Sequence, residues 1–179
     1  MSELTLAFVQ AALNAPVGAQ ADVATRIITD SREAKAGDVF VALVGEQFDG
    51  HDYVADVLAK GVVAVIVSRE VVAGDARQIV VADTLAALGQ VAQTWRLKWN
   101  PKIVALTGSN GKTTVKEMCA AILRTALGDD AVLATAGNFN NEIGMPLTLL
   151  RLQAAHKVAV LEMGMNHFGE LARLTQIAQ

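Results

Sequence analysis

The sequence contains few of the residues that mark several large classes of protein. Its single cysteine, Cys119, excludes an intramolecular disulfide framework and suits a reducing compartment. Aromatic residues make up only 4% of the 179 residues, and the net charge is −3. Base-stacking surfaces and a basic face for nucleic acid or anionic membrane are therefore not expected. Apolar runs such as 62–67 are far too short to span a bilayer.

The N-terminus also lacks the pattern of a secretory signal. It begins Met1-Ser2-Glu3, without a basic cluster followed by an apolar stretch. Hydrophobic residues make up 53% and charged residues 18%, a balance that supports a packed core. We therefore expect a cytoplasmic protein with no nucleic-acid partner and no membrane insertion.

The first half of the chain alternates short apolar segments with helical patterns. Strands are expected at 26–29, 39–43, 62–67 and 78–82, and helices at 4–13 and 53–60. Gly61 ends the second of these helices. The pattern predicts a small α/β domain over residues 1–82.

The second half begins with a predicted amphipathic helix at 84–99. The next strand, 102–106, is apolar after its first residue, which predicts a parallel strand covered on both faces. Further strands are expected at 131–134 and 158–161, and further helices from 112, near Pro146 and around Leu171, Leu174 and Ile177. In the helix from 112, a buried stripe is predicted from the spacing of Val115, Met118, Cys119, Ile122, Leu123 and Ala126. The order predicts a doubly wound parallel sheet over 83–179, cut short because three strands rarely complete one.

A glycine-rich turn joins the strand 102–106 to the helix that follows. Its residues are Gly108, Ser109, Asn110, Gly111, Lys112, Thr113 and Thr114. Such a turn offers backbone N–H groups and the positive end of a helix dipole to phosphate oxygens. Lys112 can reach the β- and γ-phosphates of ATP, and the Thr113 hydroxyl can ligate Mg²⁺. The general phosphate-loop pattern has a glycine at the position of Leu106, so this loop is a variant.

Two further polar groups follow predicted strands. Glu162 ends the strand 158–161, where doubly wound sheets bind their ligands, and is a natural partner for Mg²⁺, or else a capping or surface carboxylate. The asparagine-rich run 137–144 can donate to phosphate or carboxyl oxygens, although such turns are also common for structural reasons. His51 and His167 are possible ligands or acid–base groups, but an isolated histidine is more often a surface or hydrogen-bonded group. No Ser-His-Asp pattern or Cys/His metal spacing is visible.

The stretch 106–114 resembles the signature of the Mur ligases and their relatives, the folylpolyglutamate synthetases, whose loop also lacks the first glycine. Within that family, 137–148 and 161–170 resemble the member that adds D-alanyl-D-alanine. The stretches 29–32 and 37–40 resemble the family's uridine-nucleotide-binding domain. The resemblance covers essentially the whole chain.

The resemblance implies an ATP-dependent amide ligase of peptidoglycan precursor synthesis, and so of cell-wall biogenesis, cell shape and cell division. Its substrates would be UDP-N-acetylmuramoyl-tripeptide and D-alanyl-D-alanine, joined through an acyl phosphate, with ATP and Mg²⁺ as cofactors. Lys112 and Asn138 would be catalytic, and Thr113 and Glu162 would hold Mg²⁺. Substrate contacts are implied for Ser31, Arg32, Asp49, Asn140, Asn141 and His167.

The family continues beyond these motifs with the rest of the central sheet, a lysine that serves a second metal, and a C-terminal domain over ATP. We therefore expect this chain to be an N-terminal portion that is inactive alone, of an enzyme that is monomeric at full length. Three alternatives stay open: another ligase of the family, a small phosphate-loop kinase, and a UDP-sugar-binding module without turnover. The sequence leaves open whether the tripeptide ends in lysine or diaminopimelate.

Overall fold

The computed structural model describes residues 4–16 and 25–179, so the first three residues, on which the absence of a signal peptide was argued, lie outside it. The chain forms two compact units, which divide between Val91 and Ala92 inside helix α3 (Thr84–Trp99). The helix has the bounds expected from its amphipathic pattern. Assignment of domain roles on either side of residue 82 stays a prediction.

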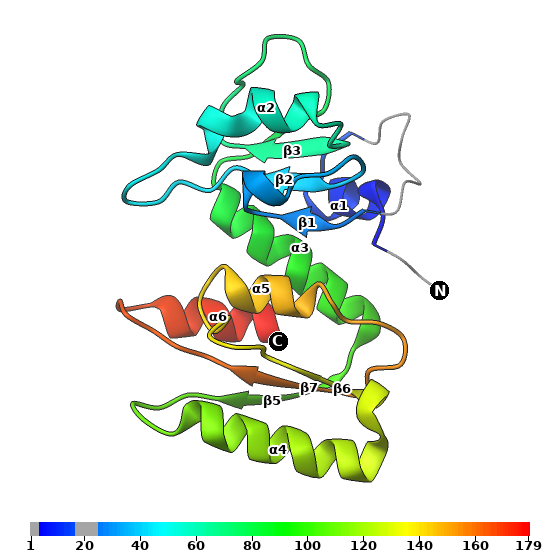
Figure 1. Ribbon diagram of the computed structural model, residues 1–179, viewed down its shortest axis with the longest axis vertical. Coiled ribbons are helices and arrows are strands. Elements are labelled where there is room, and N and C mark those ends of the chain that lie inside the picture. The colour runs from blue at the N-terminus through cyan, green and yellow to red at the C-terminus, as the bar shows by residue number, and fades with distance from the viewer. Residues whose placement is uncertain (1–3, 17–24) are drawn as a thin grey trace. The chain divides into compact units, whose positions relative to one another are not determined.

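The N-terminal unit is built on a four-stranded parallel sheet in the order β1-β2-β3-β4. Its strands are β1 (Ile27–Ile28), β2 (Val39–Val41), β3 (Ala64–Val67) and β4 (Gln78–Val80), and its helices are α1 (Leu6–Ala12) and α2 (Val54–Ala59). Short 3-10 turns stand at η1 (Ser31–Glu33) and η2 (Gly50–Tyr53). Every residue of β2 and β3 is buried, because strands in the middle of the sheet are covered on both faces (Figure 1).

The C-terminal unit is built on a three-stranded parallel sheet in the order β5-β7-β6. Its elements are β5 (Lys102–Leu106), α4 (Lys112–Leu127), η3 (Asp129–Ala131), β6 (Val132–Ala134), α5 (Gly144–Leu149), β7 (Val158–Glu162) and α6 (Glu170–Ala178). Helix α4 covers one face of the sheet, and α5 and α6 lie on the other (Figure 1). The predicted doubly wound α/β arrangement is confirmed.

The buried face of α4 differs from the predicted stripe. Val115, Met118 and Ile122 are 46%, 60% and 67% exposed, and Ala126 is exposed as well. The helix instead buries Lys116 and Ala120, with Cys119 and Leu123 partly buried beside them against the sheet. The stripe prediction was wrong because apolar residues occupy two faces of this helix and their spacing does not say which face meets the sheet.

Strand β5 is also less covered than its apolar sequence predicts. Lys102 and Ala105 are exposed, and the residues between and after them are only partly buried. Within the part of the chain that the structure describes, β5 pairs with β7 alone and is an edge strand. An edge strand has a neighbour on one side only, so the expectation of complete burial was wrong. None of the helices among residues 4–16 and 25–179 has the length and apolar character needed to cross a membrane.

Candidate functional site

The phosphate-loop residues stand between β5 and α4, as the sequence predicts. The loop from Thr107 to Gly111 is exposed throughout. Gly111 is the N-cap of α4 and has φ +77°, a left-handed conformation that glycine adopts without steric cost. As a glycine it has no side chain to cap the helix, so the first amides of α4 and its dipole are available to an anion.

Lys112 begins α4 and turns back over the loop. Its Nζ donates a hydrogen bond to the carbonyl oxygen of Gly108 at 2.5 Å. Because an ammonium group has three N–H donors, two remain for phosphate oxygens. Lys112 is thus fixed at the loop by one hydrogen bond and keeps two N–H donors for a ligand.

Glu162 lies beside this loop at the end of β7. Leu106 is its partner in the register of β5 and β7, so the carboxyl ends of both strands meet at one edge of the sheet. Glu162 is only 2% exposed. Its Oε1 accepts a hydrogen bond from Asn140 Nδ2 at 2.9 Å, whereas Oε2 is buried with no hydrogen-bond partner among the described residues.

A buried carboxylate oxygen without a partner is costly unless it binds a cation or a donor. This orphaned oxygen, together with the exposed hydroxyl of Thr113 at the start of α4, fits the oxygen ligands that Mg²⁺ prefers. Among the described residues no three His, Cys, Asp or Glu side chains gather at a metal-binding position. Mg²⁺ here would therefore complete its coordination with phosphate oxygens and water, as it does at many nucleotide sites.

The asparagine-rich run forms a loop fastened to this edge. Asn140 donates to Glu162, and its carbonyl oxygen accepts from Gly164 N at 2.8 Å. Glu142 forms an ion pair with Arg173 of α6. The loop is therefore tied to β7 and to α6.

The three predicted asparagines play different parts in this loop. Asn141 Oδ1 accepts from Ile143 N at 3.2 Å and from Gly144 N, the first residue of α5, at 2.7 Å. Asn138 is exposed and makes no side-chain hydrogen bond to the described residues. Only Asn140 is brought directly to Glu162. Roles in substrate contact for Asn140 and Asn141, and in catalysis for Asn138, stay predictions.

His167 lies at the turn before α6. Its backbone N–H, like that of Asn166, donates to Glu170 Oε2, and these two bonds lower the pKa of that carboxyl. The side chain of His167 is exposed. Its substrate contact is a prediction that nothing in the local structure opposes.

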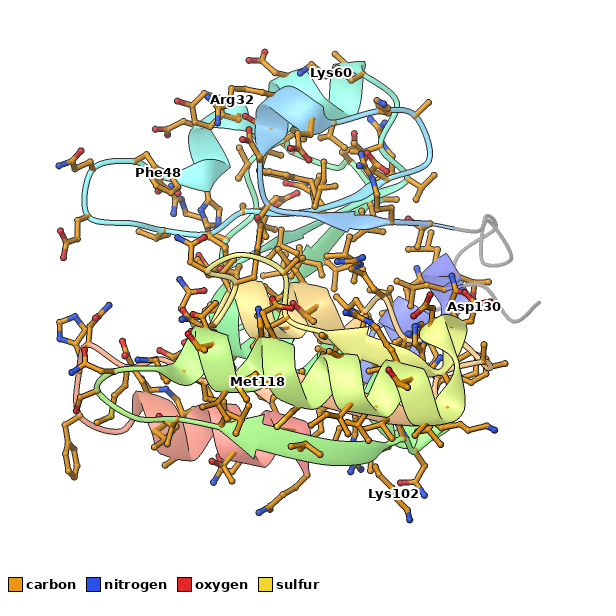
Figure 2. All side chains as sticks on the ribbon, turned by 60° about the horizontal axis from the view of Figure 1, so that its bottom comes forward. Arg32, Phe48, Lys60, Lys102, Met118 and Asp130 are labelled. Atoms are coloured by element: carbon orange, nitrogen blue, oxygen red, sulfur yellow. The ribbon has the colours of Figure 1, made fainter. Side chains whose placement is uncertain are left out.

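The N-terminal unit contains a cavity of about 450 Å³. It is lined by Thr29, Asp30, Ser31, Arg32, Phe40, Phe48, Gly50 and Tyr53. Phe48 and Tyr53 are 58% and 44% exposed, and Figure 2 shows Arg32 and Phe48 in this unit. An aromatic wall beside hydroxyls and a guanidinium suits a ligand that combines a planar ring with phosphates.

Arg32 and Asp30, which both line this cavity, form an ion pair. The guanidinium contacts both carboxylate oxygens, at 2.6 Å for the closest pair, and lowers the pKa of Asp30 to about 2. The Arg32 side chain is still 88% exposed. It is therefore oriented and also accessible to an anionic ligand.

Asp49 has a different environment. One of its oxygens accepts from the backbone N–H and from Nδ1 of His51, and the other from Arg69 at 2.9 Å. The bond from Arg69 is the main reason that the pKa of Asp49 lies well below its usual range. Since both oxygens serve these contacts, the structure gives Asp49 a local role in holding η2, and its substrate contact stays a prediction.

Behind Asp49, the ring of His51 is 1% exposed, and Ser68 N donates to its Nε2 at 2.9 Å. Nε2 therefore accepts a hydrogen bond, and Nδ1 carries the ring proton and donates a hydrogen bond to Asp49. The sequence did not suggest this Asp-His-Ser contact, which fastens the end of β3 to η2.

Sequence reasoning missed several residues of these two regions. The cavity residues Phe48 and Tyr53 could have been noted as rare aromatics near the 29–32 motif. Lys116 and Thr135 are 0% and 1% exposed and bond to each other near Glu162. Position 116 is four residues after Lys112, a spacing that places both on one side of a helix, and this was the available signal.

Both regions of the chain match known protein families. Residues 24–96 match the description "Mur ligase family, catalytic domain", and residues 106–179 match "Mur ligase middle domain". The UDP-N-acetylmuramoyl-tripeptide–D-alanyl-D-alanine ligase of Haemophilus influenzae is 49% identical over 155 residues, which are 86% of this chain and 34% of the relative. The chain thus spans about a third of the length of the curated relatives it matches.

Solved structures of Mur ligases also match this chain. MurF from Acinetobacter baumannii superposes with a TM-score of 0.88 and 41% identity, over 100% of this chain and 40% of that one. The MurF ligase from Thermotoga maritima in complex with ADP gives a TM-score of 0.78 and 35% identity, over 86% of this chain and 35% of that one. The N-terminal and C-terminal folds described above are therefore those of these two proteins.

Proposed function

The chain belongs to the Mur ligase family, and we propose that it supplies the ATP-phosphate and UDP-sugar contacts of a cytoplasmic, Mg²⁺-dependent ligase. The reaction is addition of D-alanyl-D-alanine to UDP-N-acetylmuramoyl-tripeptide, the substrates in the name of the Haemophilus relative. The observation that carries the proposal is the meeting of an exposed phosphate loop with the orphaned Glu162 oxygen at one sheet edge. The ADP named with the Thermotoga structure supports the nucleotide.

In this reaction the γ-phosphoryl group of ATP passes to the tripeptide carboxylate, and the amine of D-alanyl-D-alanine then displaces phosphate from the acyl phosphate. Charge gathers on the transferring oxygens, so fixed donors lower the barrier. Lys112 Nζ and the amides at the start of α4 are such donors, already in place around Gly108. Asn138, exposed on the neighbouring loop, is available to the carboxylate.

Thr113 and Glu162 Oε2 are the residues that would hold Mg²⁺, which supplies charge neutralisation on the phosphates. Asn140 keeps Glu162 in position by bonding its other oxygen. The carboxylate therefore reaches the sheet edge with one oxygen oriented and one free.

The UDP portion of the substrate is proposed to bind in the cavity of the N-terminal unit. The uracil ring fits beside Phe48 and Tyr53, and Arg32 can pair with the diphosphate through its planar fork. Ser31 and Thr29 supply hydroxyls at the same wall.

Calorimetry on this chain tests the two contacts separately, with Mg-ATP and with UDP-N-acetylmuramoyl-tripeptide as titrants. Lys112→Met should weaken Mg-ATP by about 10- to 100-fold, because a hydrogen bond to a charged group contributes about 1.5–3 kcal/mol, and leave the UDP substrate unaffected. Arg32→Met should weaken binding of the UDP substrate and leave the affinity for Mg-ATP unchanged. Lys102→Met, at an exposed lysine of β5 (Figure 2), is the matched control and should change neither affinity.

Binding of the UDP substrate without any binding of Mg-ATP would favour the alternative of a UDP-sugar-binding module, which the cavity alone supports. Binding of neither ligand would overturn the proposal. Turnover by a complete enzyme containing these residues with a single amino acid, and none with D-alanyl-D-alanine, would point to another ligase of the family.

A further inference from the structure

Lys116 is a buried lysine that the proposed reaction does not use. It lies in α4 four residues after Lys112 and is 0% exposed, and one turn further along the helix Ala120 belongs to the apolar cluster between α4 and the sheet. Burying an ammonium group costs free energy that a leucine or methionine of similar size would not. A lysine at this position is therefore explained only if its ammonium group donates a hydrogen bond that an apolar side chain could not make.

The contacts of Lys116 lead to the end of β6. Its Nζ donates to the carbonyl oxygen of Thr135 at 2.7 Å and forms an ion pair with Glu117 at 2.7 Å. Glu117 is at the surface, with a 59% exposed side chain, so it balances the charge from outside. The inner contact goes to the residue that directly follows β6.

Thr135 joins this lysine to the proposed metal site. Its Oγ1 accepts from Glu162 N at 3.0 Å, and its own N–H donates to Val160 O at 3.0 Å. Thr135 is thus hydrogen-bonded to α4 on one side and to β7 on the other. Glu162 in turn is held by Asn140 at Oε1 and leaves Oε2 without a partner.

We propose that Lys116 is a positioning residue: through Thr135 it sets the spacing between the phosphate-loop helix and Glu162, so that Glu162 Oε2 faces the metal of a bound nucleotide. The inference rests on the proposed function. In this proposal Lys112 binds the phosphates, and Lys116 orients the carboxylate of Glu162. Lys116 itself contacts neither nucleotide nor metal.

The effect of Mg²⁺ on ADP affinity is the measurement that isolates this role. Calorimetry with ADP in Mg²⁺ and in EDTA gives, for each variant, a metal-free affinity and its increase with Mg²⁺. Partners that orient a metal ligand typically change metal affinity about 10- to 100-fold when they are removed. Lys116→Met should therefore reduce the Mg²⁺-dependent increase at least about tenfold, while the metal-free affinity, which depends on the loop amides and Lys112, stays within about twofold.

Two variants of Thr135 test the same connection without touching the lysine. Thr135→Val removes Oγ1 and should cause the same metal-specific loss, whereas Thr135→Ser keeps the oxygen and should restore the wild-type increase. Lys102→Met is the control for loss of a lysine. Thermal unfolding of each variant establishes that it is folded. If Lys116→Met does not fold, retention of the full Mg²⁺-dependent increase by Thr135→Val still overturns the proposal, because the connection to Glu162 passes through Oγ1.

Several results would overturn the inference. Retention of the full Mg²⁺-dependent increase by Lys116→Met, or by Thr135→Val, would remove the proposed link. Equal losses with and without Mg²⁺ would show a general structural role. A wild-type chain that binds no ADP with Mg²⁺ would contradict the proposed function itself, and the inference would fall with it.

Discussion

The two units of this protein present binding features of opposite construction. The N-terminal cavity is walled by side chains from strand ends and short turns, among them Phe48 and Tyr53. The C-terminal phosphate loop is mainly backbone, with glycines where a close approach is needed. A planar base requires shape and aromatic surface, whereas phosphate requires N–H groups and positive charge.

The central strands of the two sheets are buried alike, and the two units differ at β5 and α4. Strands β2 and β3 are buried at every residue, and so is β7 in the C-terminal sheet, but β5 has no fully buried residue and α4 exposes Val115, Met118 and Ile122. Figure 2 shows Met118 on α4, and its side chain is 60% exposed. Truncation of a side chain should therefore cost far more in the N-terminal core than on the exposed side of α4.

The largest effect is expected from truncation in the N-terminal core. Phe40 is 1% exposed and belongs to an apolar core cluster of that unit. Phe40→Ala should destabilise it by about 3–5 kcal/mol, as large-to-small changes in cores do. Met118→Ala in α4 should change stability by less than about 0.5 kcal/mol. Hydrogen exchange resolved by peptide gives both values, and a similar cost for both changes would contradict the contrast.

A second prediction concerns close backbone packing in the C-terminal unit. A Cβ at Gly144 would lie 2.5 Å from Phe139 Cα and 2.7 Å from its carbonyl carbon, so the asparagine-rich loop would have to move. Gly144→Ala should cost about 1–3 kcal/mol through overpacking and increase exchange in residues 137–144.

The comparison variant is Gly37→Ala in the N-terminal unit. Gly37 has φ +91° and open space around the added Cβ. Gly37→Ala should destabilise the protein only by the strain of an alanine in the left-handed region, about 1–2 kcal/mol. Hydrogen exchange in residues 137–144 should not change. An unaltered exchange rate at 137–144 in Gly144→Ala would show that the loop is not packed as described.

The smallest effect is expected from pH. The pKa of Asp49 is lowered in the folded protein, chiefly by Arg69, so its contribution to stability is complete above about pH 4. That contribution is lost as the pH falls from there through the folded pKa. Arg69→Met should raise the pKa of Asp49 and reduce stability at pH 7 by about 0.2–1 kcal/mol, as for other partly exposed ion pairs.

Urea unfolding of wild type and Arg69→Met from pH 7 to pH 2, with a carbon-NMR titration of Asp49, measures both changes. The difference in unfolding free energy should narrow as the pH falls. A difference that stays constant with pH would mean that Arg69 acts through packing and not through the carboxylate.

The elements of the fold were predicted well because their signals are local. Helix 84–99 and strand 102–106 have the expected bounds, and the other strands lie within or close to the predicted ranges. Phosphate-loop residues are consecutive, so their arrangement follows from one strand, one turn and one helix. The cavity was harder to predict, since Thr29, Phe48 and Tyr53 come together only when separate segments pack.

By itself the sequence determined the α/β class, the phosphate loop from Gly108 to Thr114 and the family resemblance, because each rests on neighbouring residues or short spacings. Only the tertiary structure decided which side of α4 is buried, since apolar residues lie on two of its faces. That choice placed Lys116 against Thr135, which in turn bonds Glu162, and left Met118 exposed to solvent. Helical spacing lists the candidates for burial, but the surface they pack against selects among them.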